Sequence, residues 1–266
     1  MKALWYSDLR AHAMNPDQLQ VLLDTILDYR ATQDVKALFL SGNISNSVRI
    51  IDDLELLATT GLEIFFTLGN EDFYGSDWLS VKRKLASKYC DPKGMIHYLS
   101  HNTHNFMLKD GVYITGNDGI ADLLAGVIPG NACVGFDTWY IDDLKYAHNL
   151  AGESEVRRKI FDYCVSQTFT LAKDIDTILI NNPSKIVILT NVPPFTEALE
   201  GMDIVSMAFK CNQNLGDMLH IKALNNPNVK FEVYCGSVGE SRSIDKLENL
   251  KVITGVFEGI SGEVEI

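Results

Sequence analysis

The sequence has 266 residues, of which 46% are hydrophobic and 22% charged, and its formal net charge is −12. This length is enough for one large domain with a buried core, and the composition excludes a disordered or fibrous chain. The negative charge argues against nucleic acid and anionic membranes as partners. Because no apolar run reaches the roughly 18 residues of a spanning helix, we expect no membrane segment.

Five cysteines are scattered along the chain without a C-x-x-C pair, and their number is odd. This pattern argues against a disulfide framework and against a zinc knuckle, so we expect a reducing compartment. The first apolar run ends at Ser7 and Asp8 and is too short for a secretory signal, which predicts a cytoplasmic protein. The cysteines are Cys90, Cys133, Cys164, Cys211 and Cys235.

The first half of the chain alternates short apolar runs with amphipathic stretches, which is typical of a layered α/β fold. The apolar runs have the length of buried strands, and the amphipathic stretches carry apolar residues at helical spacing. In chain order we predict a strand over 3–6, a helix over 18–29, a strand over 37–40, a helix over 48–58 and a strand over 63–68.

The second half begins with three short predicted strands, and turn residues such as Asp110 and Gly111 indicate that they form antiparallel hairpins. A helical region follows, then further strands with one helix between them, and a short acidic tail. No linker or repeat divides the sequence, so one domain over 1–266 is the simplest interpretation. These strands cover 96–99, 105–108, 112–115, 185–190, 230–234 and 250–253, and the helical regions cover 137–181 and 215–224.

Polar residues collect directly after five of the predicted strands. Any one of these segments has the composition of an ordinary turn. Five of them in succession indicate a site, because the loops at the carboxyl ends of strands converge above an α/β sheet. The segments are 7–10 (SDLR), 41–43 (SGN), 69–72 (GNED), 190–194 (TNVPP) and 235–239 (CGSVG).

This series resembles the calcineurin-like metallophosphoesterases, whose motifs are, in order, D-x-H, G-D, G-N-H-D/E, a lone His and G-H-x-H. The resemblance extends from Leu4 to about Ser241, and its most specific parts are GNEDFYG and TNVPPF. It implies a four-layer α/β/β/α sandwich, with two packed mixed sheets flanked by helices. Members of the family cleave phosphate esters with two bridged divalent metals.

Carried over residue by residue, most of the family's metal ligands are absent from this sequence. Asp8 matches the first metal-binding Asp, and Asn70 matches the Asn ligand. Arg10 stands where a His ligand is expected, and Asn43 replaces the Asp that bridges both metals. Glu71 replaces the His that meets the phosphate and protonates the leaving group.

The later motifs of the series have lost their histidines as well. Asn191 replaces the lone His ligand, and Ser237 and Gly239 fall on the last two His positions. Two divalent cations need imidazole, thiolate or carboxylate donors, whereas amide oxygens are weak neutral ligands. Arg10 remains protonated, has no lone pair to donate and would repel a metal held at Asp8. We therefore expect no metal cofactor and no two-metal hydrolysis.

Three interpretations of the altered site stay open. The first is a catalytically inactive member, a pseudoenzyme, that acts as a binding or scaffold protein for an unknown protein partner, with Arg10 paired to Glu71 in the place of the metals. The second is a phosphate or nucleotide binder without hydrolysis, in which Arg10 acts with amides and hydroxyls. The third is a phosphoesterase with an altered site, either with a single metal, such as manganese or iron, on Asp8 with help from Glu71 and Asp72, or with a metal-free reaction. The second interpretation uses Arg10, Asn43, Asn70, Asn191 and Ser237.

Two further groups of residues attract attention. His97, His101 and His104 have a spacing that can ligate a metal, but a hairpin would place His101 and His104 in its turn and His97 on a strand, and we predict exposed histidines of a turn region. Asp118 and Asp122 resemble residues of a loop that borders the site in related phosphoesterases, and we expect them at the rim of the pocket.

Overall fold

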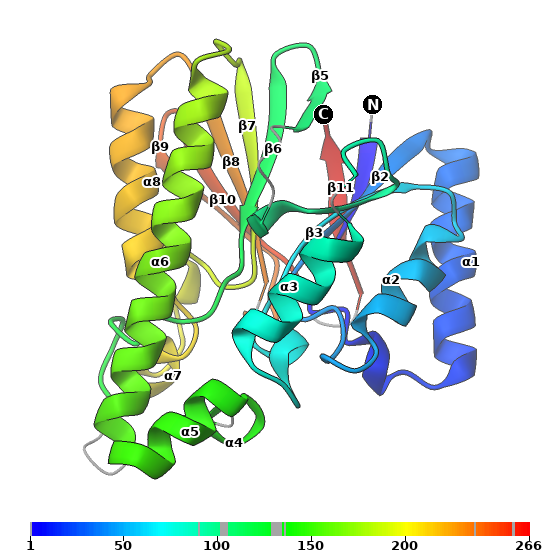
Figure 1. Ribbon diagram of the computed structural model, residues 1–266. Coiled ribbons are helices and arrows are strands. Elements are labelled where there is room, and N and C mark those ends of the chain that lie inside the picture. The colour runs from blue at the N-terminus through cyan, green and yellow to red at the C-terminus, as the bar shows by residue number, and fades with distance from the viewer. Residues whose placement is uncertain are drawn as a thin grey trace.

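The computed structural model describes residues 2–89, 91–101, 106–128, 135, 137–236, 238–256 and 259–266. In this part of the chain the strands form two mixed sheets, one of five strands and one of six, which pack face to face (Figure 1). Helices cover the outer faces of the sheets. The predicted α/β fold of two packed mixed sheets flanked by helices is confirmed.

The five-stranded sheet is parallel except at one edge. Its strands, in spatial order, are β11 (Gly259–Glu265), β1 (Lys2–Ser7), β2 (Val35–Ser41), β3 (Glu63–Thr67) and β4 (Ile96–Tyr98). The strands β1 to β4 are parallel, and β11 is antiparallel to β1. Both faces of β1 to β3 are covered, which explains why these strands have continuous apolar runs in the sequence.

The six-stranded sheet has a parallel centre and an antiparallel strand at each edge. Its strands, in spatial order, are β5 (Phe106–Lys109), β6 (Val112–Asn117), β7 (Lys185–Thr190), β8 (Lys230–Cys235), β10 (Leu250–Thr254) and β9 (Arg242–Leu247). The strands β6, β7, β8 and β10 are parallel. The edge strands β5 and β9 pair antiparallel with their neighbours.

Three helices pack on the outer face of the five-stranded sheet, and two long helices cover the six-stranded sheet (Figure 1). Several of them begin at strong caps: Asn15 and Gln18 form a capping box before the first helix, and Asp77 and Asn212 cap two others.

None of the described helices is both long and apolar enough to cross a membrane. The helices are α1 (Pro16–Thr32), α2 (Ile50–Ala58), α3 (Trp78–Lys88), α4 (Asp137–Tyr140), α5 (Asp142–Ala151), α6 (Glu153–Leu179), α7 (Ile204–Ala208) and α8 (Gln213–Asn225).

A core of large side chains joins the two sheets and thereby sets the position of their carboxyl ends. Trp5 of β1 packs edge-on against Tyr234 of β8, with ring centroids 5.1 Å apart. Phe39 and Phe65 of the five-stranded sheet belong to the same buried cluster as Leu189 of β7. Burying each of these side chains contributes roughly 1.5–3 kcal/mol. The loops after β1, β2 and β3 therefore meet the loops after β7 and β8.

Two sequence predictions of local structure are wrong. The strand predicted over 96–99 does not form a hairpin with its successor; β4 instead pairs parallel with β3, while the β5–β6 hairpin is confirmed. The residues expected to form an acidic tail contain β11, which extends the five-stranded sheet beside β1. In both cases the partner strand is distant in the sequence, so local patterns do not reveal it.

Candidate functional site

Loops that follow strands of both sheets meet in one small region, as the sequence predicted. Asp8 follows β1, Asn43 follows β2, Asn70 follows β3 and Asn191 follows β7. The loop after β8 joins them, because the backbone N–H of Gly236 donates to the carbonyl oxygen of Asn191 at 2.8 Å. The candidate site is thus built by the carboxyl ends of both sheets.

The backbone at this site is held in a costly conformation. Asp8, Arg10 and Asn43 have φ angles of 51°, 52° and 50°, in the left-handed region. Asp and Asn tolerate this region, but a bulky residue such as Arg rarely occupies it. Each such residue costs about 1–3 kcal/mol and persists only where surrounding contacts fix it. One such contact joins the N–H of Arg10 to the carbonyl oxygen of Asn43 at 2.8 Å.

Glycines allow the polar side chains to pack directly against the loops. A Cβ atom on Gly42 would lie 2.5 Å from the Cβ atom of Asn191, and one on Gly69 would lie 2.6 Å from the Cγ atom of Asn191. A Cβ atom on Gly236 would collide with the Oδ2 atom of Asp8. The side chains of Asn191 and Asp8 therefore fill the space between the loops.

The three asparagines of the site are hydrogen bonded to one another or to their neighbours. Asn43 donates from Nδ2 to Oδ1 of Asp8 at 2.8 Å and accepts through Oδ1 from the N–H of Glu71 at 3.0 Å. Asn191 donates from Nδ2 to Oδ1 of Asn70 at 3.3 Å. The Oδ1 atom of Asn191 is buried and has no hydrogen-bond partner among the described residues. The amide orientations follow from these bonds, and Asn43 turns a donor toward the Asp8 carboxylate.

Asn70 also belongs to a small network that the sequence did not reveal. Its Nδ2 atom donates to Oδ1 of Asp137 at 2.9 Å, and the hydroxyl of Tyr74 donates to the same oxygen at 2.6 Å. Burial raises the pKa of Asp137 above its usual range, while the hydrogen bonds from Tyr74 and Asn70 act in the opposite direction. The sequence placed Asp137 only at the start of a helical region.

Arg10 and Glu71 form the ion pair expected from the sequence. The Nη2 atom of Arg10 lies 2.6 Å from the Oε1 atom of Glu71. The two side chains are 30% and 16% exposed, so the pair is partly shielded from water. The guanidinium and the carboxylate thus neutralise each other inside the loop cluster.

Lys210 supplies a second cation to this region. It lines a cavity of about 60 Å³ together with Asn70 and Asp137. Burial lowers the pKa of Lys210, and the carboxylate of Asp8 is the largest influence that raises it. Lys210 lies in the short connection between α7 and α8, away from the strand ends, so motif spacing gave no signal for it.

Asp72 holds two loops together from a fully buried position. Its Oδ1 atom accepts the N–H of Ser45 at 2.8 Å, and its Oδ2 atom accepts the N–H of Gly69 at 2.8 Å. Burial raises the pKa of Asp72 to about 8, against the effect of these backbone hydrogen bonds. Asp72 therefore acts as a structural link between the loops after β2 and β3.

The donor set of this site does not fit a pair of divalent cations. Two such ions need several imidazole or carboxylate donors, and Arg10 and Lys210 add positive charge at the same place. Within the described part of the chain, no group of three or more His, Cys, Asp or Glu side chains has an arrangement suited to a metal. Ser237 lies outside the described residues, and Gly239 is a turn glycine with a φ of 86°.

The predicted exposure of the histidines is wrong for His97. This residue lies on β4, is fully buried, stacks on Phe65 with ring centroids 4.8 Å apart, and contacts Oε1 of Glu63 through Nε2 at 2.8 Å. It became buried because β4 joined the sheet instead of a surface hairpin. The side chain of His101 and all of His104 lie outside the described part of the structure.

Asp118 and Asp122 are not at the rim of the pocket. Both are 1% exposed. Asp118 pairs with Lys82 at 2.9 Å and accepts the N–H of Leu68 at 2.9 Å. Asp122 accepts the N–H of Asn214 at 2.8 Å, and burial raises its pKa. Their carboxylates are used inside the protein to hold loops, which the turn-like sequence around them did not indicate.

Comparisons with known proteins agree on the architecture. No family model and no curated protein matches this sequence. Its structure is similar to that of a dimetal phosphatase from Danio rerio, with a TM-score of 0.61 and 10% identity, over 98% of this chain and 88% of that chain. It is also similar to TT1561 of Thermus thermophilus, with a TM-score of 0.52 and 10% identity, over 97% and 89% of the two chains. The chain therefore has a metallophosphoesterase-like fold.

Proposed function

We propose that this protein uses its metallophosphoesterase-like fold as a binding or scaffold protein and does not hydrolyse phosphate esters. The observation that carries the proposal is the ion pair between Arg10 and Glu71, 2.6 Å apart. The family resemblance places a metal ligand at position 10 and the acid that protonates the leaving group at position 71. Here a permanent cation and a carboxylate occupy those positions and bind each other.

The charges around this pair support a site that is complete without metals. Arg10 and Lys210 contribute two positive charges, and Asp8, Glu71 and Asp137 contribute acidic groups nearby. In two-metal enzymes the ions supply the charge that balances the acidic ligands and the phosphate. Here side-chain cations balance the carboxyl groups, and adding divalent ions would place like charges close together.

The hydrogen bonds of the Asn43 side chain support the same proposal. Asn43 donates to Asp8 through Nδ2, which has no lone pair for a metal, and its Oδ1 atom already accepts the N–H of Glu71. A bridging ligand must offer lone pairs to both ions, and here at most one lone pair of a neutral amide oxygen is left. Position 43 therefore acts as a link between loops.

Metal analysis and an activity assay test this proposal together. The purified chain is incubated with manganese, iron and zinc salts, desalted, and examined by elemental spectroscopy. The same samples are assayed with bis(4-nitrophenyl) phosphate, with Asp8→Ala as the control variant. We expect no stoichiometric metal and no turnover. Two bound ions per chain, or turnover that the Asp8→Ala variant lacks, would overturn the proposal.

A second candidate function is the binding of a phosphate group without cleavage. It is favoured by two neighbouring cations: Lys210 lines the small cavity, and Arg10, whose side chain is 30% exposed, is close enough to influence the pKa of Lys210. Arginine and lysine are the residues that most often bind phosphate. A thermal-shift screen with inorganic phosphate and nucleotides tests it, because a specific ligand raises the melting temperature with its concentration. An increase that the Arg10→Met variant loses would support this second function.

A further inference from the structure

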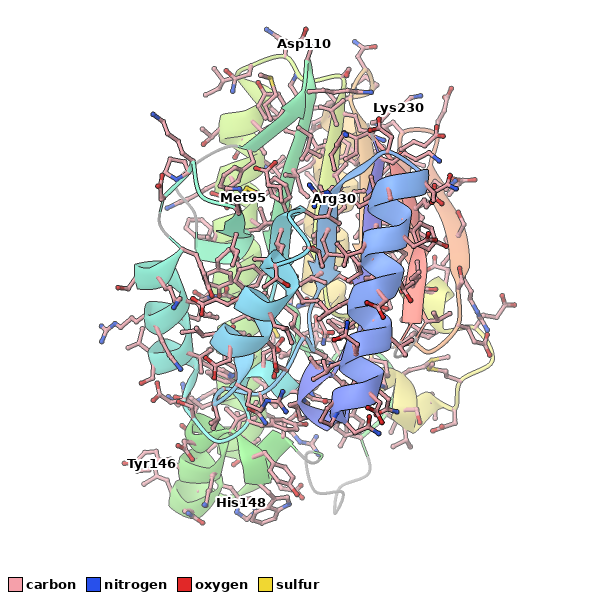
Figure 2. The ribbon with its side chains drawn as sticks, turned by 90° about the vertical axis from the view of Figure 1, so that its right-hand side faces the viewer. Arg30, Met95, Asp110, Tyr146, His148 and Lys230 are labelled. Carbon is pink, nitrogen blue, oxygen red and sulfur yellow. The ribbon has the colours of Figure 1, made fainter. Side chains whose placement is uncertain are left out.

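A groove outside the candidate site lies between helix α1 and the edge strand β11. Its volume is about 440 Å³, which is the size of cavities that accept a ligand or a partner's side chains. Figure 2 shows α1 in blue and β11 in red side by side on the face turned to the viewer. The apolar part of the lining consists of Tyr6, Met14, Val21, Leu22 and Ile260.

One face of α1 carries three aspartates, of which Asp17 lines the groove and Asp24 and Asp28 lie beyond its lining. Asp17, Val21, Asp24 and Asp28 follow one another at intervals of four, three and four residues, which places them on one side of the helix. Val21 and Asp17 line the groove itself, and the Val21 side chain is 65% exposed. The one basic residue of α1 is Arg30, at its far end, where it donates to the carbonyl oxygen of Thr60. This side of the helix therefore has an apolar centre and a negative border.

The strand β11 also presents acidic side chains on the side of the sheet that faces α1. In the register of the sheet Leu4 lies opposite Glu263, and Lys2 lies opposite Glu265. Leu4 belongs to the core beneath α1, so the side chains of Glu263 and Glu265 also point to the helix side. Glu263 is paired with Lys2 at 2.7 Å, and Glu265 adds a further exposed carboxylate. The groove itself is lined by Gly259 and Ile260 at the start of β11, and the two glutamates lie beyond it along the same strand.

The outer backbone edge of β11 borders the sheet face that carries the groove, and the carbonyl oxygen of Glu265 accepts from Nζ of Lys185 at 2.9 Å. Strand β11 is the last strand of its sheet, and no other strand in the described part of the chain pairs with its outer edge. An edge strand leaves alternate N–H and C=O groups outside the ladder, and an extended peptide can satisfy them. The same place thus offers backbone groups, an apolar pocket and acidic borders.

We propose that this groove binds an extended, basic peptide segment of a partner protein. One apolar side chain of the peptide occupies the pocket between Met14, Val21 and Ile260. Lysine or arginine side chains on either side of it lie along the carboxylates of α1 and β11. The groove does not overlap the candidate site, so the proposal holds whether or not that site is catalytically silent.

The charge of the groove decides between a basic peptide and other occupants. Nucleic acid and acidic peptides would bring negative charge against the aspartates of α1. A second copy of this chain, docked symmetrically, would place the same acidic face against itself, because a twofold interface pairs each patch with its own copy. A basic segment is the occupant whose charge complements the groove, and its apolar residue covers the exposed Val21 side chain.

The proposal is tested by nuclear magnetic resonance titration of the full, isotope-labelled chain with three matched peptides. The probe is acetyl-Lys-Ser-Leu-Ser-Lys-amide, whose symmetry presents a basic residue on both sides of leucine in either direction. The control peptides replace leucine by serine, or both lysines by glutamate. We expect chemical-shift changes of backbone amides in 14–28 and 259–265 on addition of the probe. Both control peptides should bind at least about tenfold more weakly than the probe.

Two variants locate the binding surface. Val21→Arg places a bulky cation in the groove and should weaken binding of the probe about tenfold. Val48→Arg is the matched control, because Val48 is 72% exposed and lies outside the groove. Equal binding of the acidic peptide, shifts confined to other surfaces, or no binding in the millimolar range would overturn the proposal. So would a homodimer that the Val21→Arg variant abolishes, because the groove would then be covered by a second copy.

Discussion

Asn43 donates its side-chain N–H to the carboxylate of Asp8 at 2.8 Å, across the ends of two neighbouring strands. The Asp8 residue is 1% exposed, so this hydrogen bond is formed away from water. Buried carboxylates need donors or cations, and the bond to Asn43 is one source of that stabilisation. The hydrogen bond also joins the loops that follow β1 and β2.

Replacing Asn43 by Asp should destabilise the protein at neutral pH. Two buried carboxylates would then face each other, and their repulsion raises the pKa of the pair. We expect a loss of about 2–4 kcal/mol in the free energy of unfolding at pH 8. Because the folded state would hold an extra proton, this variant should recover stability as the pH falls toward 5. Urea denaturation at both pH values measures the effect.

Asn43→Ala is the matched control for this prediction. It removes the hydrogen bond to Asp8 without adding a charge, so its cost should grow less between pH 5 and pH 8 than that of Asn43→Asp. An equal pH dependence of both variants would contradict the repulsion argument. If manganese selectively restores the stability of Asn43→Asp, the variant has regained part of a metal site.

The ion pair of Arg10 and Glu71 should contribute measurably to stability. Its side chains are 30% and 16% exposed, so water screens it less than a surface pair. A double-mutant cycle with Arg10→Met and Glu71→Gln should give a coupling energy of about 1 kcal/mol. The matched control is the pair of Lys36 and Asp34, whose side chains are 59% and 77% exposed and whose coupling should be near zero. Equal coupling energies in the two cycles would show that the shielding has no effect.

Local sequence patterns predicted the central strands well, because those strands are buried on both faces and have continuous apolar runs. They failed at the edges of the five-stranded sheet. The segment GISGEVE of β11 has two glycines and two glutamates, which lower its strand propensity, and it is a strand because β1 pairs with it. The short strand β4 finds its partner in β3, about thirty residues earlier, and a three-residue run cannot specify that choice.

The candidate site was predictable where residues follow strands in a fixed order. That order placed Asp8, Asn43, Asn70 and Asn191 together and also the pair of Arg10 and Glu71. Asp137 and Lys210 were missed because they lie at helix ends, where no motif spacing relates them to the strands. Their position depends on how α4 and the α7–α8 connection pack over the loops.

Asp72 should make stability depend on pH. Burial raises its folded pKa to about 8, above the roughly 3.9 of an unfolded Asp, so the folded state holds more protons between these values. The stability that the folded state gains by binding this proton is fully present below the unfolded pKa, and it is lost as the pH rises through about 8. The wild-type free energy of unfolding should therefore fall between pH 5.5 and 8.5 by up to about 1.4 kcal/mol per pH unit from this group.

The Asp72→Asn variant separates this titration from the role of Asp72 in joining the loops. The amide keeps one acceptor but sets an N–H donor against the backbone N–H of Ser45 or Gly69, which should cost about 1–3 kcal/mol at every pH. Its stability should vary less with pH than that of the wild type over the same range. Parallel pH profiles for the two proteins would contradict the raised pKa.

The buried pair of Lys82 and Asp118 should be the most sensitive ion pair of the fold. Its side chains are 12% and 0% exposed, and Asp118 also accepts hydrogen bonds from Tyr98 and the N–H of Leu68. Lys82→Met removes the cation and leaves a buried carboxylate, which should lower the free energy of unfolding by about 3–5 kcal/mol. The matched variant is Lys88→Met on the same helix, whose partner is exposed and whose loss should cost at most about 1 kcal/mol. Chemical denaturation of both variants at pH 7 measures the two losses in the free energy of unfolding. Similar losses would mean that Asp118 is stabilised by its hydrogen bonds alone and not by the charge of Lys82.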